Sequence, residues 1–465
     1  MKRLTLLVGA ALLAGCAGVR PPIPAEAAFT APAAWRSPGA LAGAGPDPWW
    51  TSFGDLALTR VVETALAHND DVAIAAERVE EARSQYRLAA AERLPDLVGG
   101  GQGGRVRDVN PGFGIPEEQN FGGVTVTATW DLDLFGRLRS ASRAARASLL
   151  ASQDARDGVR LAVAASAAQA YLNLRALDAR LGVLQDTLQA RGEALRVIRR
   201  RADAGYAAQL DLRQAEAEYH SAEQLVPATQ LAIRRQEDAL SLLLGESPSE
   251  IPRGVALTAL EPPVVPGGMP SSLLRRRPDV AAAEQQMVAA DRSLDAARAA
   301  FMPRLQLSVQ GGGVVADLIE QNPTGTFNLA AGLLGPIFDA GRLRAQEGIV
   351  AARRNEAAFA YRKTALSAFR DVEDALAGVR RSAEQERALV QTRDAYAAAL
   401  KLATSRYRSG YAPYLDQIDA ERALLSAQLT LVQARVDRLD AAVSLFQGLG
   451  GGWSKAGDAP LAAKP

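Results

Sequence analysis

Two regions of the chain alternate between apolar and polar residues. The apolar positions of the first region, within residues 122–134, are Val124, Val126, Ala128, Trp130 and Leu132, and threonine or aspartate lies between them. In the second region, Leu305, Leu307 and Val309 alternate with Gln306, Ser308 and Gln310. A period of two predicts β-strands that each have one apolar and one polar face.

A different pattern predicts two very long helices. Residues 137–203 and 341–407 contain no proline, and each stretch of 67 residues corresponds to about 100 Å of α-helix. Apolar residues in the first of them recur at spacings of three and four. The same spacing continues from Leu425 to Phe446 near the end of the chain. Such sustained spacing is typical of helices that pack along one another.

The elements belong to a unit that occurs twice in the chain. Asp71-Val72-Ala73 recurs as Asp279-Val280-Ala281, an offset of 208, and Gly205-Tyr206 recurs as Gly410-Tyr411, an offset of 205. The first copy spans 49–244 and the second 275–447. Each copy has a helix, a β-hairpin, a long helix and a return helix. In the first copy these are predicted at 56–93, 95–134, 137–203 and 207–244. In the second copy a helix precedes a hairpin at 303–338, and the long and return helices are predicted at 341–407 and 413–447. Pro227 predicts a kink or break in the first return helix.

The segments outside the two copies have different compositions. Lys2 and Arg3 precede a short apolar core, which is typical of a signal peptide over 1–15. The sole cysteine, Cys16, follows Ala14-Gly15, which resembles a bacterial lipobox with lipid attached to Cys16. Residues 16–48 are a proline-rich linker that we expect to be extended. A connector at 245–274 separates the copies, and 448–465 form a C-terminal tail.

Composition excludes several classes of function. Lys and Arg number 53 and Asp and Glu 52, a net charge of +1, which gives no sign of nucleic-acid binding. Two His and one Cys argue against a metal site or disulfides. Gly99, Gly101 and Gly104 match a dinucleotide-binding pattern, but no helix is predicted after them, so we interpret them as strand residues. We find no catalytic motif and predict no enzymatic activity and no cofactor other than the lipid on Cys16.

The four predicted strands cannot form a closed membrane barrel within one chain, because the smallest such barrels have about eight strands. Open sheet edges are not tolerated in lipid. If the strands span a membrane, several chains must therefore combine them: two chains give eight and three give twelve.

The sequence resembles the outer membrane factors of the TolC/OprM type, which are exit ducts of tripartite efflux systems. The resemblance rests on Pro48-Trp49-Trp50 with Asp55, on Trp130 to Arg139, on Arg276 to Val280, and on Tyr407 to Arg422. It implies an α+β membrane protein that forms a homotrimer, with a 12-stranded β-barrel in the outer membrane and a 12-helix α-barrel in the periplasm. Residues 245–274 would belong to an equatorial belt. A periplasmic adaptor protein, an inner-membrane pump and outer membrane lipid are the implied partners.

The resemblance also implies two sets of functional residues. Gly205, Tyr206, Gly410 and Tyr411 would form the tips that contact the adaptor, although each glycine is equally expected as a helix C-cap. Asp416 and Asp419, one helical turn apart, would form a periplasmic gate with Tyr407. Ala412 departs from the TolC pattern, which has an arginine there. Asp416 could instead stabilise only the first turn of its helix.

Two other functions would use parts of the same pattern. A type I protein-secretion channel of the outer membrane is the alternative, and Cys16 favours the efflux branch. A structural coiled-coil lipoprotein would use the same helices but would not need two hairpins at matched repeat positions.

Overall fold

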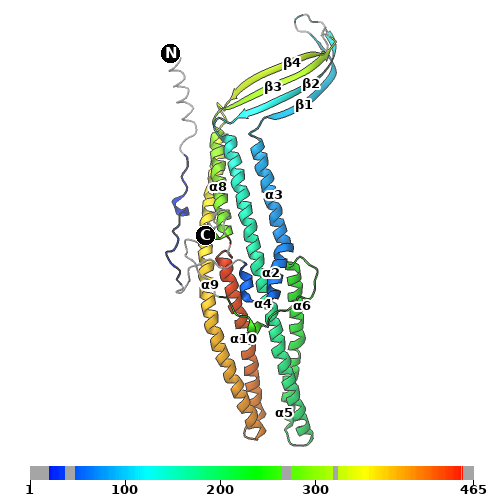
Figure 1. The fold of residues 1–465 in the computed structure, drawn as a ribbon, viewed down its shortest axis with the longest axis vertical. Coiled ribbons are helices and arrows are strands. Elements are labelled where there is room, and N and C mark those ends of the chain that lie inside the picture. Colours follow the sequence, from blue (N-terminus) through cyan, green and yellow to red (C-terminus); the bar gives the residue numbers. More distant parts are fainter. Residues whose placement is uncertain are drawn as a thin grey trace, which may run out of the picture. The chain divides into compact units, whose positions relative to one another are not determined.

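The computed structural model describes residues 20–36, 48–109, 112, 114, 116–263, 274–317, 323–451 and 453. They form two compact units, and α3, α4, α8 and α9 each contribute to both (Figure 1). The described helices are α2 (Leu56–His68), α3 (Asp70–Ala91), α4 (Arg137–Asp203), α5 (Gln209–Glu223), α6 (Leu225–Leu243), α8 (Pro278–Ala299), α9 (Arg342–Arg408) and α10 (Tyr414–Gly448), with short 3-10 turns at η1 (Ala25–Ala27), η2 (Trp49–Phe53) and η3 (Leu257–Ala259). No described helix is apolar enough, over sufficient length, to cross a membrane.

The first unit contains a single antiparallel sheet. Its strands are β1 (Asp96–Val109), β2 (Pro116–Leu132), β3 (Arg304–Ala316) and β4 (Thr324–Leu334), in the order β1-β2-β3-β4. The two hairpins therefore join through β2 and β3, where Val124 is opposite Gly313. On its other side Val124 is opposite Gly101 of β1. Strands β1 and β4 are the two edges of the sheet.

The register places most of the large apolar residues of the four strands on one face. Residues directly opposite one another across an antiparallel pair share a face, and on this face they are Leu97, Gly99, Gly101, Val124, Val126, Ala128, Trp130, Leu132, Leu305, Leu307, Val309, Gly311, Gly313, Phe327, Leu329, Ala331 and Leu333. The opposite face carries the polar residues Gln102, Thr125, Thr127, Thr129, Gln306, Ser308, Gln310, Thr326 and Asn328, together with Val98, Val314, Ala330 and Leu334. The alternation seen in the sequence thus becomes two continuous surfaces.

Strand ends lead into the long helices through the same junction in both copies. The carboxylate of Asp133 accepts hydrogen bonds from the backbone N–H groups of Leu138 and Arg139, at 3.1 and 2.8 Å. In the second copy, Asp339 accepts one from the N–H of Leu343 at 2.9 Å. Each aspartate satisfies N–H groups that a helix start leaves without partners.

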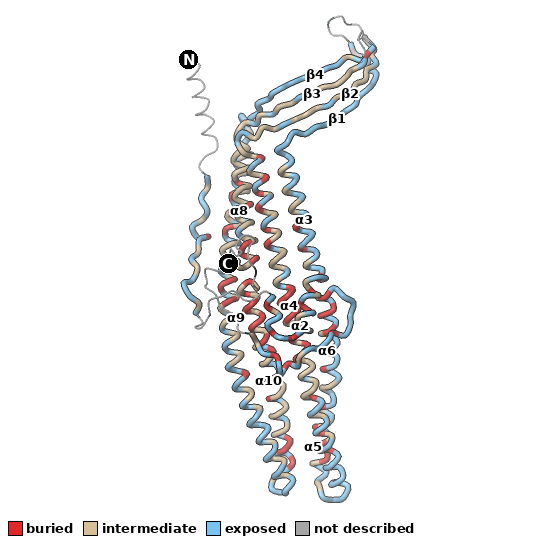
Figure 2. The backbone as a smooth tube through the Cα atoms, viewed as in Figure 1, coloured by how far each residue is buried: buried red, intermediate tan, exposed pale blue. Residues whose placement is uncertain are grey.

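The second unit contains the main hydrophobic core. Figure 2 shows its buried residues gathered where α2, α4, α6 and α10 meet. Trp49 is fully buried, and its ring stacks on Phe446 with ring centroids 5.3 Å apart. Val436, Leu439 and Val443 of α10 belong to the same cluster. This core fixes the return helix α10 against the first repeat.

Residues 20–36 lie extended beside α8 and α9, except for the turn at η1. In the first unit, Arg20 forms an ion pair with Asp291 at 2.6 Å. The buried guanidinium of Arg354 donates to the carbonyl oxygens of Pro21 and Pro22 at 2.7 and 2.8 Å. This part of the proline-rich linker is therefore held by polar contacts.

The long helices agree with the predicted ranges to within one residue, but the first helix does not. Residues 56–93 were predicted as one helix, and this is wrong, because the chain is extended at Asn69 between α2 and α3. The side chain of Asn69 accepts hydrogen bonds from the N–H groups of Asp71 and Val72, which caps α3. The first return helix is also broken: α5 ends at Glu223 and α6 begins at Leu225. Pro227 lies in the first turn of α6, where backbone N–H groups have no acceptor within the helix, so the N–H that proline lacks is not missed.

Candidate functional site

Both long helices end in the same turn. Gly205 and Gly410 have φ values of 77° and 79°, a conformation that favours glycine. The N–H of Tyr206 donates to the carbonyl of Arg201 at 2.7 Å, and that of Tyr411 to the carbonyl of Arg406 at 2.9 Å. This is the Schellman pattern of a helix C-terminus. The glycines therefore act as C-caps, as one interpretation of the sequence predicted.

The tyrosines after these glycines are available for contact. The side chains of Tyr206 and Tyr411 are both 80% exposed in the single chain. Large exposed aromatic residues are common at protein interfaces, because they add contact area at little entropic cost. Adaptor contact at these turns stays a prediction.

Tyr407 lies close to the end of α9 and packs against α10. Its ring centroid is 5.1 Å from that of Tyr414, which is almost fully buried. Burial, together with the nearby carboxylate of Asp211, raises the pKa of Tyr407 above its ordinary value. Asp211 is in the first turn of α5. The structure therefore adds Asp211, from the first repeat, to the surroundings of Tyr407.

Asp416 and Asp419 lie on the exposed surface of α10, in the first turns after Pro413. The carboxylate of Asp419 is 3.8 Å from the guanidinium of Arg422. Tyr407 and the two aspartates are thus at the same end of the α9–α10 pair, but the ring of Tyr407 packs on Tyr414. Their role as a gate stays a prediction, and so does the alternative role of Asp416 at the helix N-terminus.

A buried ion cluster joins the two repeats just beyond these residues. Glu218 of α5 is 5% exposed, and its carboxylate is 2.9 Å from the guanidinium of Arg191 on α4. The Arg422 guanidinium of α10 also donates to Glu218, with Nε at 2.9 Å. Removing one member of a buried pair costs about 3–5 kcal/mol, because it leaves an uncompensated charge. Sequence reasoning missed this cluster, and the only local signal was Arg191, which interrupts the apolar spacing of α4.

A neighbouring acid on α10 is partly buried. The carboxylate of Glu421 accepts a hydrogen bond from the Gln417 amide at 2.8 Å. Burial raises the pKa of Glu421 above its ordinary value. The end of the α9–α10 pair therefore contains both exposed and partly buried acids.

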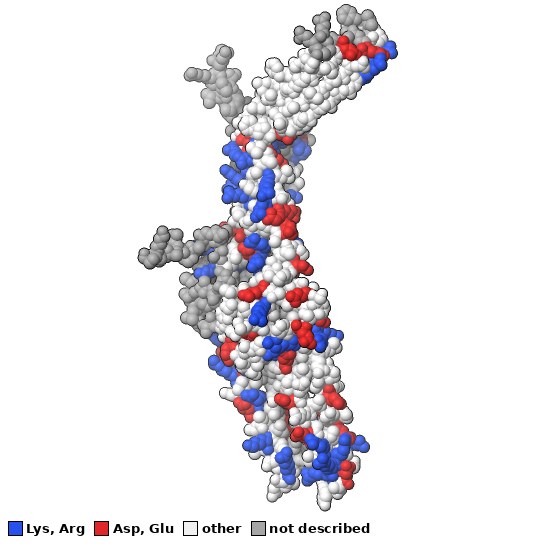
Figure 3. Space-filling view, turned by 45° about the vertical axis from the view of Figure 1, so that its right-hand side comes forward, with Lys and Arg blue, Asp and Glu red and all other residues white. Residues whose placement is uncertain are grey.

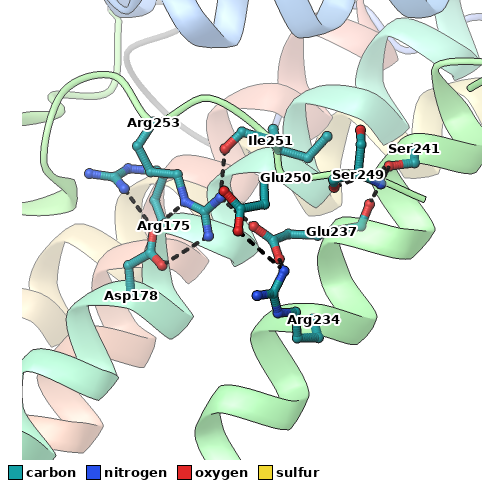
Figure 4. Close-up of polar contacts among 9 residues, drawn as sticks. All are labelled: Arg175, Asp178, Arg234, Glu237, Ser241, Ser249, Glu250, Ile251 and Arg253. Atoms are coloured by element: carbon teal, nitrogen blue, oxygen red, sulfur yellow. Dashed lines mark hydrogen bonds and ion pairs between the residues drawn. The ribbon is translucent and has the colours of Figure 1, made fainter. Parts of the chain in front are cut away.

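Further along the second unit, polar residues tie the start of the connector to α4 and α6 (Figure 4). The Arg253 guanidinium donates to Asp178 at 3.1 Å and to Glu237 at 2.5 Å. Although burial alone would lower it, these two carboxylates raise the pKa of Arg253. Arg234 lies 3.4 Å from Glu250 on the same network. The contacts hold residues 249–255 in place.

The same part of the connector contacts a buried carboxylate. Asp55, 1% exposed, accepts hydrogen bonds from the Tyr171 hydroxyl and the Val255 N–H, both at 3.1 Å. Burial, with the charge of Asp55, raises the pKa of Tyr171 to about 12. A Cβ atom at Gly254 would be only 2.0 Å from the Asp55 carboxylate, so this close approach requires glycine.

The remaining residues singled out in the sequence do not form a site among the described residues. Cys16 and the predicted signal peptide lie outside the described residues. Gly99, Gly101 and Gly104 lie in β1. The ring of His220 is 2.8 Å from Glu223, and the described part of the chain contains no group of His, Cys, Asp and Glu able to hold a metal ion.

The sheet has an exposed apolar face and few charged residues. On its apolar face Val124 is 67% exposed and Phe327 is 90% exposed, although such residues are normally covered. Charged residues are absent from 97–104, 119–130, 305–316 and 324–334. Figure 3 accordingly shows the strands white along most of their length. A sheet whose middle is uncharged and whose apolar face is exposed suits contact with lipid.

Comparison with known proteins agrees with this chemistry. The profile of the outer membrane efflux protein family matches residues 61–246 and 269–451. The chain belongs to the outer membrane efflux protein family. The two matched ranges coincide closely with the two repeats, so the match covers each copy separately.

Individual members of the outer membrane efflux protein family are similar to this chain over most of its length. The solvent efflux pump outer membrane protein SrpC of Pseudomonas putida is 36% identical over 408 residues, which cover 86% of this chain and 87% of SrpC. The cation efflux system protein CusC of Escherichia coli is 32% identical over 415 residues, 88% of each chain. The crystal structure of a membrane protein from Pseudomonas aeruginosa superimposes with a TM-score of 0.83 at 33% identity, and the match covers 91% of this chain and 99% of that one.

Proposed function

We propose that this chain is the outer membrane exit duct of a tripartite efflux pump, and that three copies combine their strands into a 12-stranded barrel. The observation that carries the proposal is the sheet. One face is apolar across all four strands, and β1 and β4 are edges. Edges cannot be exposed to lipid, so β1 of one copy would pair with β4 of the next. The apolar face would then contact lipid, and the polar face would line the channel.

The helices would continue the duct into the periplasm as a 12-helix barrel. Cargo would pass through it without chemistry, delivered by an inner-membrane pump through a periplasmic adaptor. The named relatives, SrpC and CusC, are components of solvent and cation efflux systems. This favours an efflux duct over a type I protein-secretion channel. Lipid on Cys16 would anchor the chain in the outer membrane.

The sheet offers a matched pair of substitutions that tests this proposal. Val126 is on the apolar face, and the adjacent Thr127 is on the polar face. Arginine on a lipid-facing position of a membrane barrel costs about 2–4 kcal/mol per site near the bilayer midplane. We therefore expect Val126→Arg to prevent membrane assembly. Thr127→Arg should assemble and reduce the preference of the channel for cations.

Two measurements distinguish these outcomes. Native mass spectrometry of the detergent-extracted protein should give a trimer for wild type and for Thr127→Arg, and planar-bilayer recording should show conducting channels for both. Equal behaviour of the two variants, or a stable monomer without conductance for wild type, would overturn the shared barrel.

The turns at Gly205 and Gly410 would dock the adaptor, supported by the exposed Tyr206 and Tyr411. Since Cys16 is the only native cysteine, cysteines that replace Ala207 and Ala412 can be crosslinked selectively. We expect each to crosslink to the adaptor in cells. If neither position crosslinks in a strain that still exports cargo, the adaptor does not dock at these turns.

A gate formed by Asp416, Asp419 and Tyr407 would close the periplasmic end. In a trimer the aspartates would supply up to six carboxylates around one opening, and their combined negative potential would favour cations. The ring of Tyr407 packs on Tyr414 of α10, and the charge of Asp211 on α5 acts on the Tyr407 hydroxyl. Movement of α5 or α10 would therefore change the surroundings of Tyr407, which supports a role for this residue in the gate.

A further inference from the structure

The exposed apolar face of the sheet continues into charged residues at the strand ends that are far from α3 and α4. Beyond Gly103 of β1, the next residues on this face are Arg105 and Arg107. The residues of β2 directly opposite them are Asn120 and Glu118. Figure 3 shows basic and acidic side chains gathered at this end of the sheet. We call these four residues, Arg105, Arg107, Glu118 and Asn120, the outer belt.

The outer belt lies one membrane span away from the start of α4. On β2, the positions of the apolar face from Leu132 to Gly122 are uncharged, over a segment of 11 residues. A tilted strand needs about 9–11 residues to cross the hydrocarbon core. Arginine that faces lipid costs little near the membrane interface, whereas it is costly at the midplane. With the helices in the periplasm, as in the proposed duct, the outer belt would lie at the headgroups of the outer leaflet.

The two arginines of the outer belt share one carboxylate. Their side chains are 69% exposed for Arg105 and 67% exposed for Arg107. The Glu118 carboxylate accepts a hydrogen bond from Arg105 and lies 3.5 Å from the Arg107 guanidinium. One negative charge cannot balance two guanidinium groups, each of which has several N–H donors. Most of these donors have no acceptor among the described residues.

A second acid nearby is engaged by an amide and not by the arginines. The carboxylate of Asp317, just after β3, accepts hydrogen bonds from the backbone N–H and the side-chain amide of Asn120, at 3.1 and 2.7 Å. Asn120 is opposite Arg105 on its other side, so it lies between Asp317 and that arginine. Within the described part of the chain, no ion pair joins Asp317 to Arg105 or Arg107. The two arginines with Glu118 therefore keep an excess of one positive charge.

Exposed guanidinium groups at this depth suit a phosphorylated lipid. Phosphate oxygens accept the parallel N–H donors of arginine, and a compact basic group at a membrane surface attracts anionic headgroups. The outer leaflet of a bacterial outer membrane consists mainly of lipopolysaccharide, whose lipid A headgroup carries phosphate groups. We propose that Arg105 and Arg107 together bind a phosphate group of lipid A, while Glu118 holds the two guanidinium groups side by side. This inference rests on the proposed barrel, which puts the outer belt in the outer leaflet.

Native mass spectrometry of the trimer with added lipid A measures this contact, because each bound lipid adds its own mass. Wild type should bind lipid A. Arg105→Gln combined with Arg107→Gln should weaken the affinity by about 25-fold, a factor of about five for each arginine. The matched control is Arg83→Gln, because Arg83 also pairs with a glutamate, Glu80, on the protein surface but belongs to α3. This control should bind lipid A as wild type does.

Lipid A from which the phosphate groups have been removed gives a test that needs no variant. Wild type should bind it about as weakly as the glutamine variant binds intact lipid A. Equal affinity of wild type for the two forms, or equal affinity of wild type and the glutamine variant for intact lipid A, would overturn the phosphate contact. Binding of phosphatidylglycerol with the same dependence on the two arginines would overturn the assignment to lipid A.

The same preparations separate this inference from the proposed function. If a wild-type trimer that conducts does not bind lipid A, the outer belt has another role while the duct stands. If wild type neither forms trimers nor conducts, the proposed function itself fails.

Discussion

Replacing Asp55 with alanine should destabilise the protein far more than an ordinary surface change. The carboxylate accepts hydrogen bonds from the N–H groups of Ala57 and Leu58, at 2.7 and 3.2 Å, and so caps α2. It also accepts from the Tyr171 hydroxyl and the Val255 N–H. Loss of the cap costs about 1 kcal/mol. The Tyr171 hydroxyl is buried and the Val255 N–H is partly buried, and each donor left without a partner costs about 2 kcal/mol, so about 5 kcal/mol is expected in all.

Two further variants divide this cost into its parts. Asp55→Ser should retain the cap, because serine is a good N-cap residue, but it is too short to reach Tyr171 and Val255; we expect a loss of about 4 kcal/mol. Tyr171→Phe leaves the N–H of Gly254 without its acceptor, at 2.9 Å in the structure, and should cost about 2 kcal/mol. Asp71→Ala, an exposed acid in the first turn of α3, is the control and should cost under about 1 kcal/mol.

The assay is urea unfolding of the detergent-solubilised protein, followed by tryptophan fluorescence, since Trp49 is fully buried in the same core. All variants must be compared at equal protein concentration, because unfolding is coupled to assembly. The reasoning is refuted if Asp55→Ala unfolds within about 1 kcal/mol of Asp71→Ala, a difference that one lost cap alone would explain.

Three further predictions concern the anchor, the gate and the carboxyl group of Asp440. Cys16→Ser should abolish incorporation of an alkyne-labelled fatty acid, and equal labelling of wild type and variant would contradict lipid attachment at Cys16. The variant with Asp416→Ala and Asp419→Ala should show larger openings and weaker cation preference in planar bilayers; unchanged conductance in an assembled trimer would leave only the helix-capping role. Burial, with the charge of Asp437, raises the pKa of Asp440 to about 7 in the single chain. Because the folded chain disfavours the charged form of this carboxyl group, stability to urea should fall between pH 5 and pH 8, and Asp440→Asn should remove that part of the fall.

Elements with a long, regular pattern could be predicted from the sequence. The absence of proline defined α4 and α9 to within one residue at each end, and the three-and-four spacing supported α4. The break at Asn69 could not be found in this way, because the apolar pattern continues across it. The side chain of Asn69 separates α2 from α3, because it caps α3 and donates to the Leu243 carbonyl at 3.0 Å. That carbonyl is far away in sequence, so only the folded chain reveals the contact.

The candidate site shows the same limit. Local spacing put Asp416 and Asp419 on one face of α10, and this follows from helix geometry alone. The contact of Glu218 with Arg422 joins residues of different repeats, and the approach of Asp211 to Tyr407 does likewise. No periodicity encodes which helix of one copy packs against which helix of the other. These partners therefore had to come from the three-dimensional arrangement.

The uncharged middle of the sheet has a consequence for selectivity. In the proposed barrel, its polar face offers threonine, glutamine, serine and asparagine side chains to a passing molecule. Such groups form hydrogen bonds with water and with solutes of either sign, but they create no fixed electrostatic barrier or well. A cation, an anion and a neutral organic molecule would then meet nearly the same energy profile between residues 119 and 130. Cargoes would then be selected before they reach the outer membrane. The same barrel lining could therefore serve pumps with unrelated substrates.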